Sequence, residues 1–219
     1  MQNPWPLLPM IPPYVLPSDK PFLSGMAHAR DRETTVRLDT LPYPYLGNPK
    51  TATVCLLALN GGFDDKVLNY LRDDPAYVEQ RRKSLLFESD YPFFYLDPRF
   101  SNTLGYRWWH NRLRDLINQY GPKTIAEKVM CVQYFPYCSK TYKPVSRMLP
   151  SQKYSFDLVR QAITENKVIV IMRSRRMWLD AVPELENYPF IELTNPRTPY
   201  LKQNHMTTEQ WGQISLSLQ

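Results

Sequence analysis

Glycine and cysteine are the two residue types of which this chain has little. Seven of its 219 residues are glycine and three are cysteine. An odd number of cysteines without a CxxC pair argues against both a disulfide framework and a zinc site. Cys55 and Cys131 lie within apolar runs, and with Cys138 we expect them to be reduced, buried and unreactive, as is typical of cytoplasmic proteins.

Long apolar runs and nucleotide-binding motifs are also absent. No segment approaches the roughly 20 apolar residues of a membrane helix. The N-terminus has no basic region followed by a proline-free apolar run, so we expect no signal peptide and a cytoplasmic protein. Neither GxxxxGK(S/T) nor GxGxxG occurs, which argues against a nucleoside triphosphate or dinucleotide site. Because no metal or iron–sulfur ligand set is visible, we expect no metal and no cofactor.

The residues that are present fit one globular domain. Apolar residues make up 43% of the chain, enough for a sizeable core, and we expect a single domain and a monomer. Prolines crowd into the first 22 residues, which predicts an extended arm, within residues 1–40, packed on the domain. Lysine and arginine number 27 against 21 acids, a net charge of +6. That excess suits a nucleic-acid partner and simple solubility about equally.

Apolar runs alternate with helical patterns along the rest of the chain. We expect strands at 52–59, 128–135, 167–172 and 190–193. The first is apolar enough to be buried on both faces, which is typical of a parallel sheet covered by helices. The pattern predicts an α/β fold in three layers, with a short, mostly parallel four-stranded sheet between helices.

The helices between these strands have recognisable start signals. We expect a helix capped by Asp64 and broken or restarted at Pro75, and a later helix with Trp109 and Ile117 on one face. Two further helices are expected to begin with a cap at Ser151 and with a capping box formed by Thr207 and Gln210.

Polar, aromatic and basic residues follow each predicted strand. In parallel sheets, ligands bind outside the carboxyl ends of the strands, so these segments should share one edge. Together they can hold a planar ring and an anionic backbone, whereas the first segment alone is equally well explained as a plain strand-to-helix turn. The four segments are NGGFDD at 60–65, YFPYCS at 134–139, RSRR at 173–176 and NPR at 195–197.

These segments are similar to motifs of the uracil-DNA glycosylase superfamily. LNGGF at 59–63 resembles the Asn-Pro-Gly motif of the mismatch-specific branch, with Gly61 in place of proline. FFYLDPRFSNTLGYRWW at 93–109 resembles the following segment, and VQYFPYCS at 132–139 matches the end of the base-recognition strand. LTNPRTPY at 193–200 resembles the late loop that enters the minor groove, with Arg197 in place of serine. The resemblance covers roughly residues 40 to 205, in the right order.

The resemblance implies a monofunctional DNA glycosylase that hydrolyses the bond between the sugar and a uracil-like or modified base flipped out of DNA. Asn60 would orient the attacking water, and Asp64, Asp65 and Asp97 are the acids near enough to act as a general base. A helix cap is the simpler role for Asp64, and a turn role is open for Asp97. Asn195 would read a base edge or form an Asn-Pro turn.

The remaining site residues are predicted from the same resemblance. Phe63, Phe94, Tyr95, Tyr134 and Phe135 would bind the base together with Gly61, which lets a ligand approach closely. We expect DNA contacts from a second group, in which any arginine can equally be a solvated surface charge: Ser139, Arg173, Arg175, Arg176, Arg197, Asn204 and His205.

Two other functions remain open on the sequence alone. One is a non-catalytic member of the same fold that binds DNA or a protein. The other is an unrelated α/β enzyme acting on a free nucleotide or nucleoside. The paired Trp108 and Trp109 are most simply explained by core packing.

Overall fold

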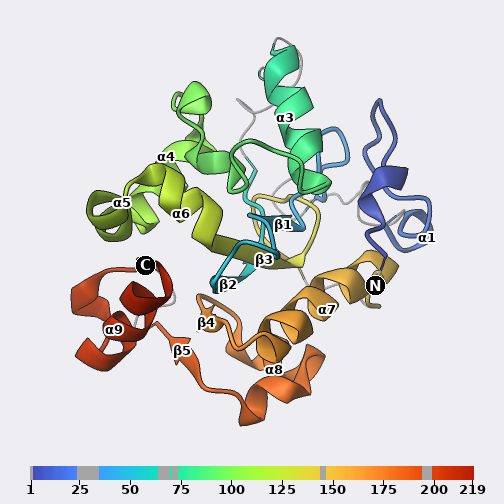
Figure 1. Cartoon of the computed structure of the whole chain (residues 1–219). Helices are drawn as coiled ribbons and strands as arrows, with labels where there is room; N and C mark the ends of the chain where they lie inside the picture. Colours follow the sequence, from blue (N-terminus) through green and yellow to red (C-terminus); the bar gives the residue numbers. More distant parts are fainter. Residues whose placement is uncertain (1, 24–34, 64–69, 71–73, 144–146, 194–198) are drawn as a thin grey trace.

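The computed structural model describes residues 2–23, 35–63, 70, 74–143, 147–193 and 199–219. It is an α/β structure with a five-stranded mixed sheet in the order β1-β3-β2-β4-β5 (Figure 1). The strands are β1 (Tyr45–Leu46), β2 (Val54–Asn60), β3 (Val129–Phe135), β4 (Val168–Ile171) and β5 (Phe190–Glu192).

Four of these strands confirm the expected parallel sheet. β2 pairs in parallel with β3 on one side and with β4 on the other, and β4 pairs in parallel with β5. The fifth strand, β1, pairs antiparallel with β3, and the prediction of four strands missed it. β1 has only two residues and lies just after two prolines, so its sequence carries no strand periodicity.

Helices cover both faces of the sheet. α7 and α8 lie on one side in Figure 1, and α4, α5, α6 and α9 lie on the other. The α-helices of the described residues are α1 (Lys20–Leu23), α3 (Pro75–Leu85), α4 (Leu104–Arg112), α5 (Arg114–Tyr120), α6 (Pro122–Lys128), α7 (Pro150–Thr164), α8 (Arg175–Ala181) and α9 (Thr208–Ser217). None of them is long and apolar enough to cross a membrane.

Strand alternation divides the core into two parts. Cys55 and Leu57 of β2 point toward the side of α7, whereas Val54, Leu56 and Ala58 point toward α4 and α6. Because successive side chains of a strand face opposite sides, Asn60 at the end of β2 shares the second face. Residues at the strand ends can therefore line a common site only if their side chains lie on the same face of the sheet.

The helix starts are predicted with mixed success. The capping box of α9 is confirmed, since the Thr207 hydroxyl accepts from the Gln210 amide and the Gln210 side chain accepts from the Thr207 amide. The cap at Ser151 is wrong, because α7 begins one residue earlier and the Gln152 side chain accepts from the Leu149 amide. Ser151 instead donates its amide to buried Asp19.

Two other helix predictions change in detail. α3 begins at Pro75 and is capped by Asp74, while the expected cap at Asp64 lies outside the described residues. The segment from Trp109 to Ile117 forms the end of α4 and most of α5, which meet at Leu113, and not one continuous helix.

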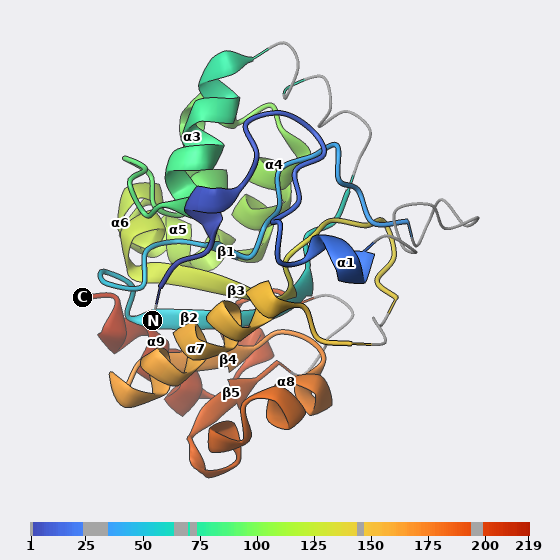
Figure 2. The ribbon, with the colours of Figure 1, turned by 90° about the vertical axis from the view of Figure 1, so that its right-hand side faces the viewer.

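The proline-rich N-terminal segment packs against the domain through some of its apolar residues. Trp5 and Leu16 are buried, whereas Leu7 and Ile11 are largely exposed. α1 lies beside the connection between β3 and α7, as Figure 2 shows. Asp19 at the start of α1 is fully buried and accepts a hydrogen bond of 2.8 Å from the Tyr137 hydroxyl of that connection.

Candidate functional site

The sheet order marks the place where a ligand crevice is expected. The chain passes from β2 to β3 on one side and then crosses over to β4 on the other side of β2. Crevices form where the strand order reverses in this way, outside the carboxyl ends of the strands. Here that point lies between Asn60, which ends β2, and Arg173, which follows β4.

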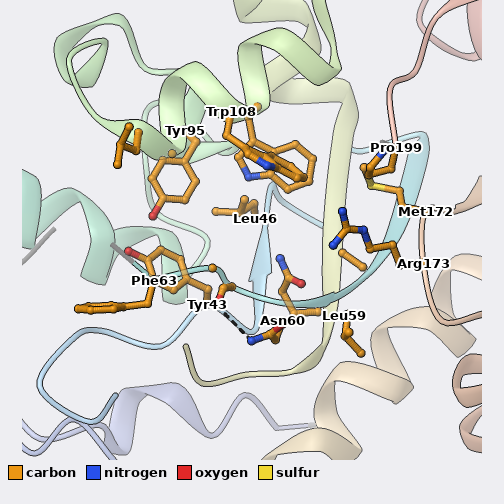
Figure 3. Close-up of a pocket in the computed structure, with 17 residues that line it drawn as sticks. Tyr43, Leu46, Leu59, Asn60, Phe63, Tyr95, Trp108, Met172, Arg173 and Pro199 are labelled. Atoms are coloured by element: carbon orange, nitrogen blue, oxygen red, sulfur yellow. Dashed lines mark hydrogen bonds between the residues drawn. The ribbon is translucent and has the colours of Figure 1, made fainter. Parts of the chain in front are cut away.

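A cavity of about 240 Å³ occupies this point. Figure 3 shows Tyr95 and Trp108 on the helical side and Asn60 facing them from the sheet, with Met172 and Arg173 to one side. The lining residues are Tyr43, Leu46, Ala58, Leu59, Asn60, Gly61, Gly62, Phe63, Tyr95, Leu104, Gly105, Trp108, Trp109, Gln133, Met172, Arg173 and Pro199.

Gln133 gives the cavity an unpaired polar group. This residue lies on β3 and is 5% exposed, and its side-chain carbonyl oxygen finds no hydrogen-bond partner among the described residues. Leaving a buried polar group unpaired costs about 1–3 kcal/mol, so such a group in a cavity marks a place for a ligand donor. The sequence reasoning missed Gln133, although a lone amide in the apolar run VMCVQYF was the available signal.

Asn60 is held in one orientation by its neighbours. Its side-chain NH2 donates to the Ser139 hydroxyl at 3.0 Å and to the Gly61 carbonyl at 3.3 Å. The amide nitrogen is thereby engaged, and the carbonyl oxygen of the side chain is the remaining acceptor. Ser139 is 3% exposed and its hydroxyl accepts from Asn60, so the structure gives it a contact that positions Asn60, and its predicted contact with a phosphate stays a prediction.

Packing explains the first of the two glycines that follow Asn60. A side chain at Gly61 would place its Cβ 3.1 Å from both the Cys138 sulfur and the Tyr43 ring. Gly62 has open space around it, and neither glycine has a positive φ. The two glycines are therefore not needed for a left-handed turn, and Gly61 serves close packing at the cavity wall.

Aromatic residues form the wall opposite the strands. The rings of Tyr43 and Tyr95 stack with their centroids 5.6 Å apart, and Trp108 contacts Trp109 edge-on at 4.7 Å. Gly105 of α4 lies against Tyr95, since a Cβ there would be 2.2 Å from the ring. The pair of tryptophans thus lines the cavity in addition to packing the core, and a planar ligand can find a stacking surface here.

The predicted base-binding residues fall into two groups. Gly61, Phe63 and Tyr95 line the cavity. The structure places the others outside it: Phe94 is fully buried against Tyr77 and Phe100, Phe135 is buried against Tyr137 and Tyr142, and Tyr134 packs on Phe156 and Trp178. Tyr134 lies on the opposite face of the sheet from Gln133 because neighbouring strand residues alternate.

The predicted DNA-binding residues are also divided. Arg173 lines the cavity, while Arg175 lies 3.3 Å from Glu192 of the edge strand β5 and Arg176 lies 4.0 Å from Asp180. Asn204 is exposed, and the half-buried His205 contacts the Tyr200 ring edge-on. Asp65, Asn195 and Arg197 lie outside the described residues.

No carboxylate of the described residues lines the cavity. Asp97, considered as a general base, is buried in a salt bridge with Arg99 and caps a short helical turn. The described residues contain no group of histidine, cysteine and acidic side chains able to hold a metal ion. The cavity therefore offers amide groups, aromatic faces and one arginine to a ligand.

Comparison with known proteins adds no family assignment. No family model, curated protein or solved structure matches this chain.

Proposed function

We propose that this chain is a monofunctional DNA glycosylase with a uracil-DNA glycosylase-like fold, acting on a uracil-like or modified base extruded from DNA. The observation that carries the proposal is the unpaired, buried Gln133 carbonyl beside Asn60 in an aromatic-walled cavity at the strand ends. An extruded base needs aromatic faces for stacking and a polar group that reads its edge. The Gln133 carbonyl accepts from an N–H group, which uracil-like rings carry.

Asn60 has the geometry to hold a water. Its amide nitrogen is engaged by Ser139 and Gly61, so its oxygen can accept a hydrogen bond from water placed near the sugar. An amide cannot take up a proton at neutral pH, and this step therefore relies on stabilising the negative charge of the departing base. Asp65 stays a candidate base, and Asn195 stays a candidate for reading the base edge.

DNA is the proposed partner and no cofactor is required. Arg173 at the cavity edge would contact a phosphate next to the extruded nucleotide. Arg175, Arg197, Asn204 and His205 stay proposed DNA contacts, and hydrolysis by water needs no lysine nucleophile.

The proposal is tested with labelled oligonucleotides that carry uracil, mismatched thymine, or oxidised, alkylated or hypermodified bases, followed by alkali to cleave abasic sites. We expect cleavage at one class of base and a loss of about 100-fold or more in Asn60→Ala, with DNA affinity little changed. Asn118→Ala, an exposed asparagine on α5, is the matched control.

A non-catalytic binder of DNA is the second candidate. The observation that favours it is the lack of a carboxylate among the described residues of the cavity. Tight DNA binding by the folded protein, with no cleavage of any of these bases, would establish this second function and refute the first.

A further inference from the structure

A buried positive charge lies directly behind the aromatic wall of the cavity. Arg81 of α3 is 0% exposed, and its guanidinium donates to the Pro42 carbonyl at 2.8 Å and to the Ser84 hydroxyl at 3.2 Å. Its Nε–H has no partner among the described residues. Arginine stays protonated in proteins, so this group is a permanent cation in the interior.

No formal negative charge of the described residues balances this cation. The neighbouring ionisable groups are the Tyr43, Tyr77 and Tyr95 phenols and the Cys138 thiol, and burial raises the pKa of the last three well above neutrality. All three are therefore uncharged at physiological pH, and no acid of the described residues forms an ion pair with Arg81. A buried charge without a counter-charge is strongly unfavourable, and buried ionisable groups in perturbed environments cluster at functional sites.

The position of Arg81 relates this charge to the cavity. Its guanidinium carbon lies 4.0 Å from the centre of the Tyr43 ring and 5.8 Å from that of Tyr95. Both rings line the cavity, whereas Arg81 does not. The Tyr43 ring therefore contacts the cation and also borders the space that a ligand would occupy. A cation on one side of a ring draws its electrons and makes the other side attractive to negative charge.

We propose that Arg81 makes the cavity selective for a planar ring that carries negative charge, acting through Tyr43 and Tyr95. The counter-charge that the described residues do not give Arg81 is then supplied by the bound ligand. The preference for charge deepens the proposed function and rests on it only for the identity of the ring, which would be the departing base.

In that reaction the bond between the sugar carbon and the base nitrogen breaks, and its electron pair stays on the base. The oxygen of water forms the new bond to the sugar carbon, and a proton of that water finally neutralises the base. Arg81 is a positioning residue for this charge, since a ring lies between it and the reacting atoms. It lowers the energy of the state in which the base is an anion.

Arg173 is the competing source of positive charge because it lines the cavity itself. The two arginines differ in burial: Arg173 is partly exposed, whereas Arg81 is shielded from solvent. The screening length of salt is about 10 Å at 0.1 M ionic strength and shortens as salt is added, so interactions of exposed charges weaken while those of buried charges are screened much less. A charge preference that survives added salt therefore points to Arg81.

The test compares two rings of similar size by isothermal titration calorimetry with the full chain. Barbiturate is an anion at neutral pH and uracil is neutral, and both carry N–H groups for Gln133. We expect barbiturate to bind roughly 10- to 50-fold more tightly, which is the attraction expected across one ring at an effective dielectric constant near 20. Arg81→Met should bring the ratio close to one, while Arg81→Lys should keep most of it.

Arg82→Met is the matched control. Arg82 is the next residue of α3, also donates to a proline carbonyl and also lies near a tyrosine ring, but it faces Pro9 and Tyr14 of the N-terminal segment. Its loss should leave the ratio unchanged. Circular dichroism shows whether each variant is folded. If Arg81→Met does not fold, the Arg81→Lys variant and the salt series on the unaltered protein test whether the charge preference comes from Arg81.

Three outcomes would overturn the proposal: equal affinity for the two rings, no binding of either ring to the folded protein, or a preference that disappears with Arg173→Met or with salt but persists in Arg81→Met. None of these measurements depends on base excision. A failure of the charge preference is therefore distinct from a failure of the glycosylase assay.

Discussion

The side chain of Gln133 is expected to lower the stability of the empty protein and to favour the binding of a ligand. Its carbonyl oxygen is buried without a partner among the described residues, so this group opposes folding while it is empty. Asn60 lies on the neighbouring strand β2, two residues beyond Ala58, which pairs with Gln133. In contrast to the Gln133 carbonyl, the side-chain nitrogen of Asn60 donates two hydrogen bonds. Buried polar groups in native structures are nearly always hydrogen-bonded, so the unpaired carbonyl calls for an explanation, and a donor group of a ligand would supply its partner.

Replacing Gln133 by leucine tests this contrast. Leucine has a similar size and no polar atom, so we expect the free energy of unfolding to stay the same or to rise by about 1 kcal/mol. Affinity for uracil should fall roughly 5- to 10-fold, the worth of about one hydrogen bond. Urea unfolding and calorimetry measure the two quantities.

Ser155→Ala is the control for Gln133→Leu, since alanine adds no volume at this buried position. Ser155 is fully buried on α7 and its hydroxyl also lacks a partner among the described residues, yet it lies outside the cavity. Ser155→Ala should leave the affinity for uracil unchanged. A Gln133→Leu protein that is less stable and binds uracil normally would show that the amide has a structural role only.

At the scale of elements, strand alternation explains both the success and the failure of the sequence reasoning. The four parallel strands were predictable because each is an apolar run between turn residues. Asn60 was predictable as well, since it directly follows such a run. The aromatic candidates on β3, Tyr134 and Phe135, lie outside the cavity: Tyr134 faces α7, and its neighbour Gln133 faces the cavity.

Other parts of the site depend on contacts between distant segments. Tyr43 and Arg81 are 38 positions apart, and nothing in the local pattern of either residue indicates that the Arg81 guanidinium lies over the Tyr43 ring. Phe94 and Tyr95 are adjacent, but only Tyr95 reaches the cavity. Sequence periodicity predicts which face of an element is apolar and does not predict which pair of faces encloses a cavity.

The contact between α4 and the cavity wall gives a prediction at this scale. Gly105→Ala would place a methyl group 2.2 Å from the Tyr95 ring, so the ring must move. We expect a loss of about 1–3 kcal/mol in the free energy of unfolding, as for an overpacked core, together with weaker binding of uracil and barbiturate alike. Thermal unfolding and calorimetry measure these effects.

Gly212→Ala provides the matched control for α4. Gly212 is also helical, in α9, but a Cβ there meets nothing within 4 Å. Alanine is favoured over glycine in helices, so this variant should be more stable by roughly 0.5–1 kcal/mol and bind the rings normally. Equal behaviour of the two variants would mean that Tyr95 has room to move and does not shape the cavity.

At the scale of the whole molecule, the N-terminal segment is connected to the site through the β3–α7 connection. The Tyr137 hydroxyl donates to Asp19 and accepts from the Leu16 amide at 3.1 Å. Two residues further on, Ser139 holds Asn60. The backbone amides of Arg37 and Tyr43 donate to the carbonyls of Cys138 and Pro136, which ties the same connection to the chain before β1.

Tyr137→Phe removes the hydroxyl that contacts both Leu16 and Asp19 and leaves the aromatic ring in place. The buried Leu16 amide loses its acceptor, and among the described residues the buried Asp19 carboxylate keeps only the Ser151 amide as a donor. Each loss leaves a buried polar group short of a partner, so we expect the free energy of unfolding to fall by about 2–4 kcal/mol in urea unfolding.

Tyr154→Phe is the control, since Tyr154 belongs to the same core cluster and its hydroxyl has no hydrogen bond to any described residue. If the two variants lose the same small amount of stability, the N-terminal segment is held by its apolar contacts alone. If only Tyr137→Phe is destabilised, the segment is tied to the fold at the connection that carries Ser139, and its removal should disturb Asn60 before it unfolds the sheet.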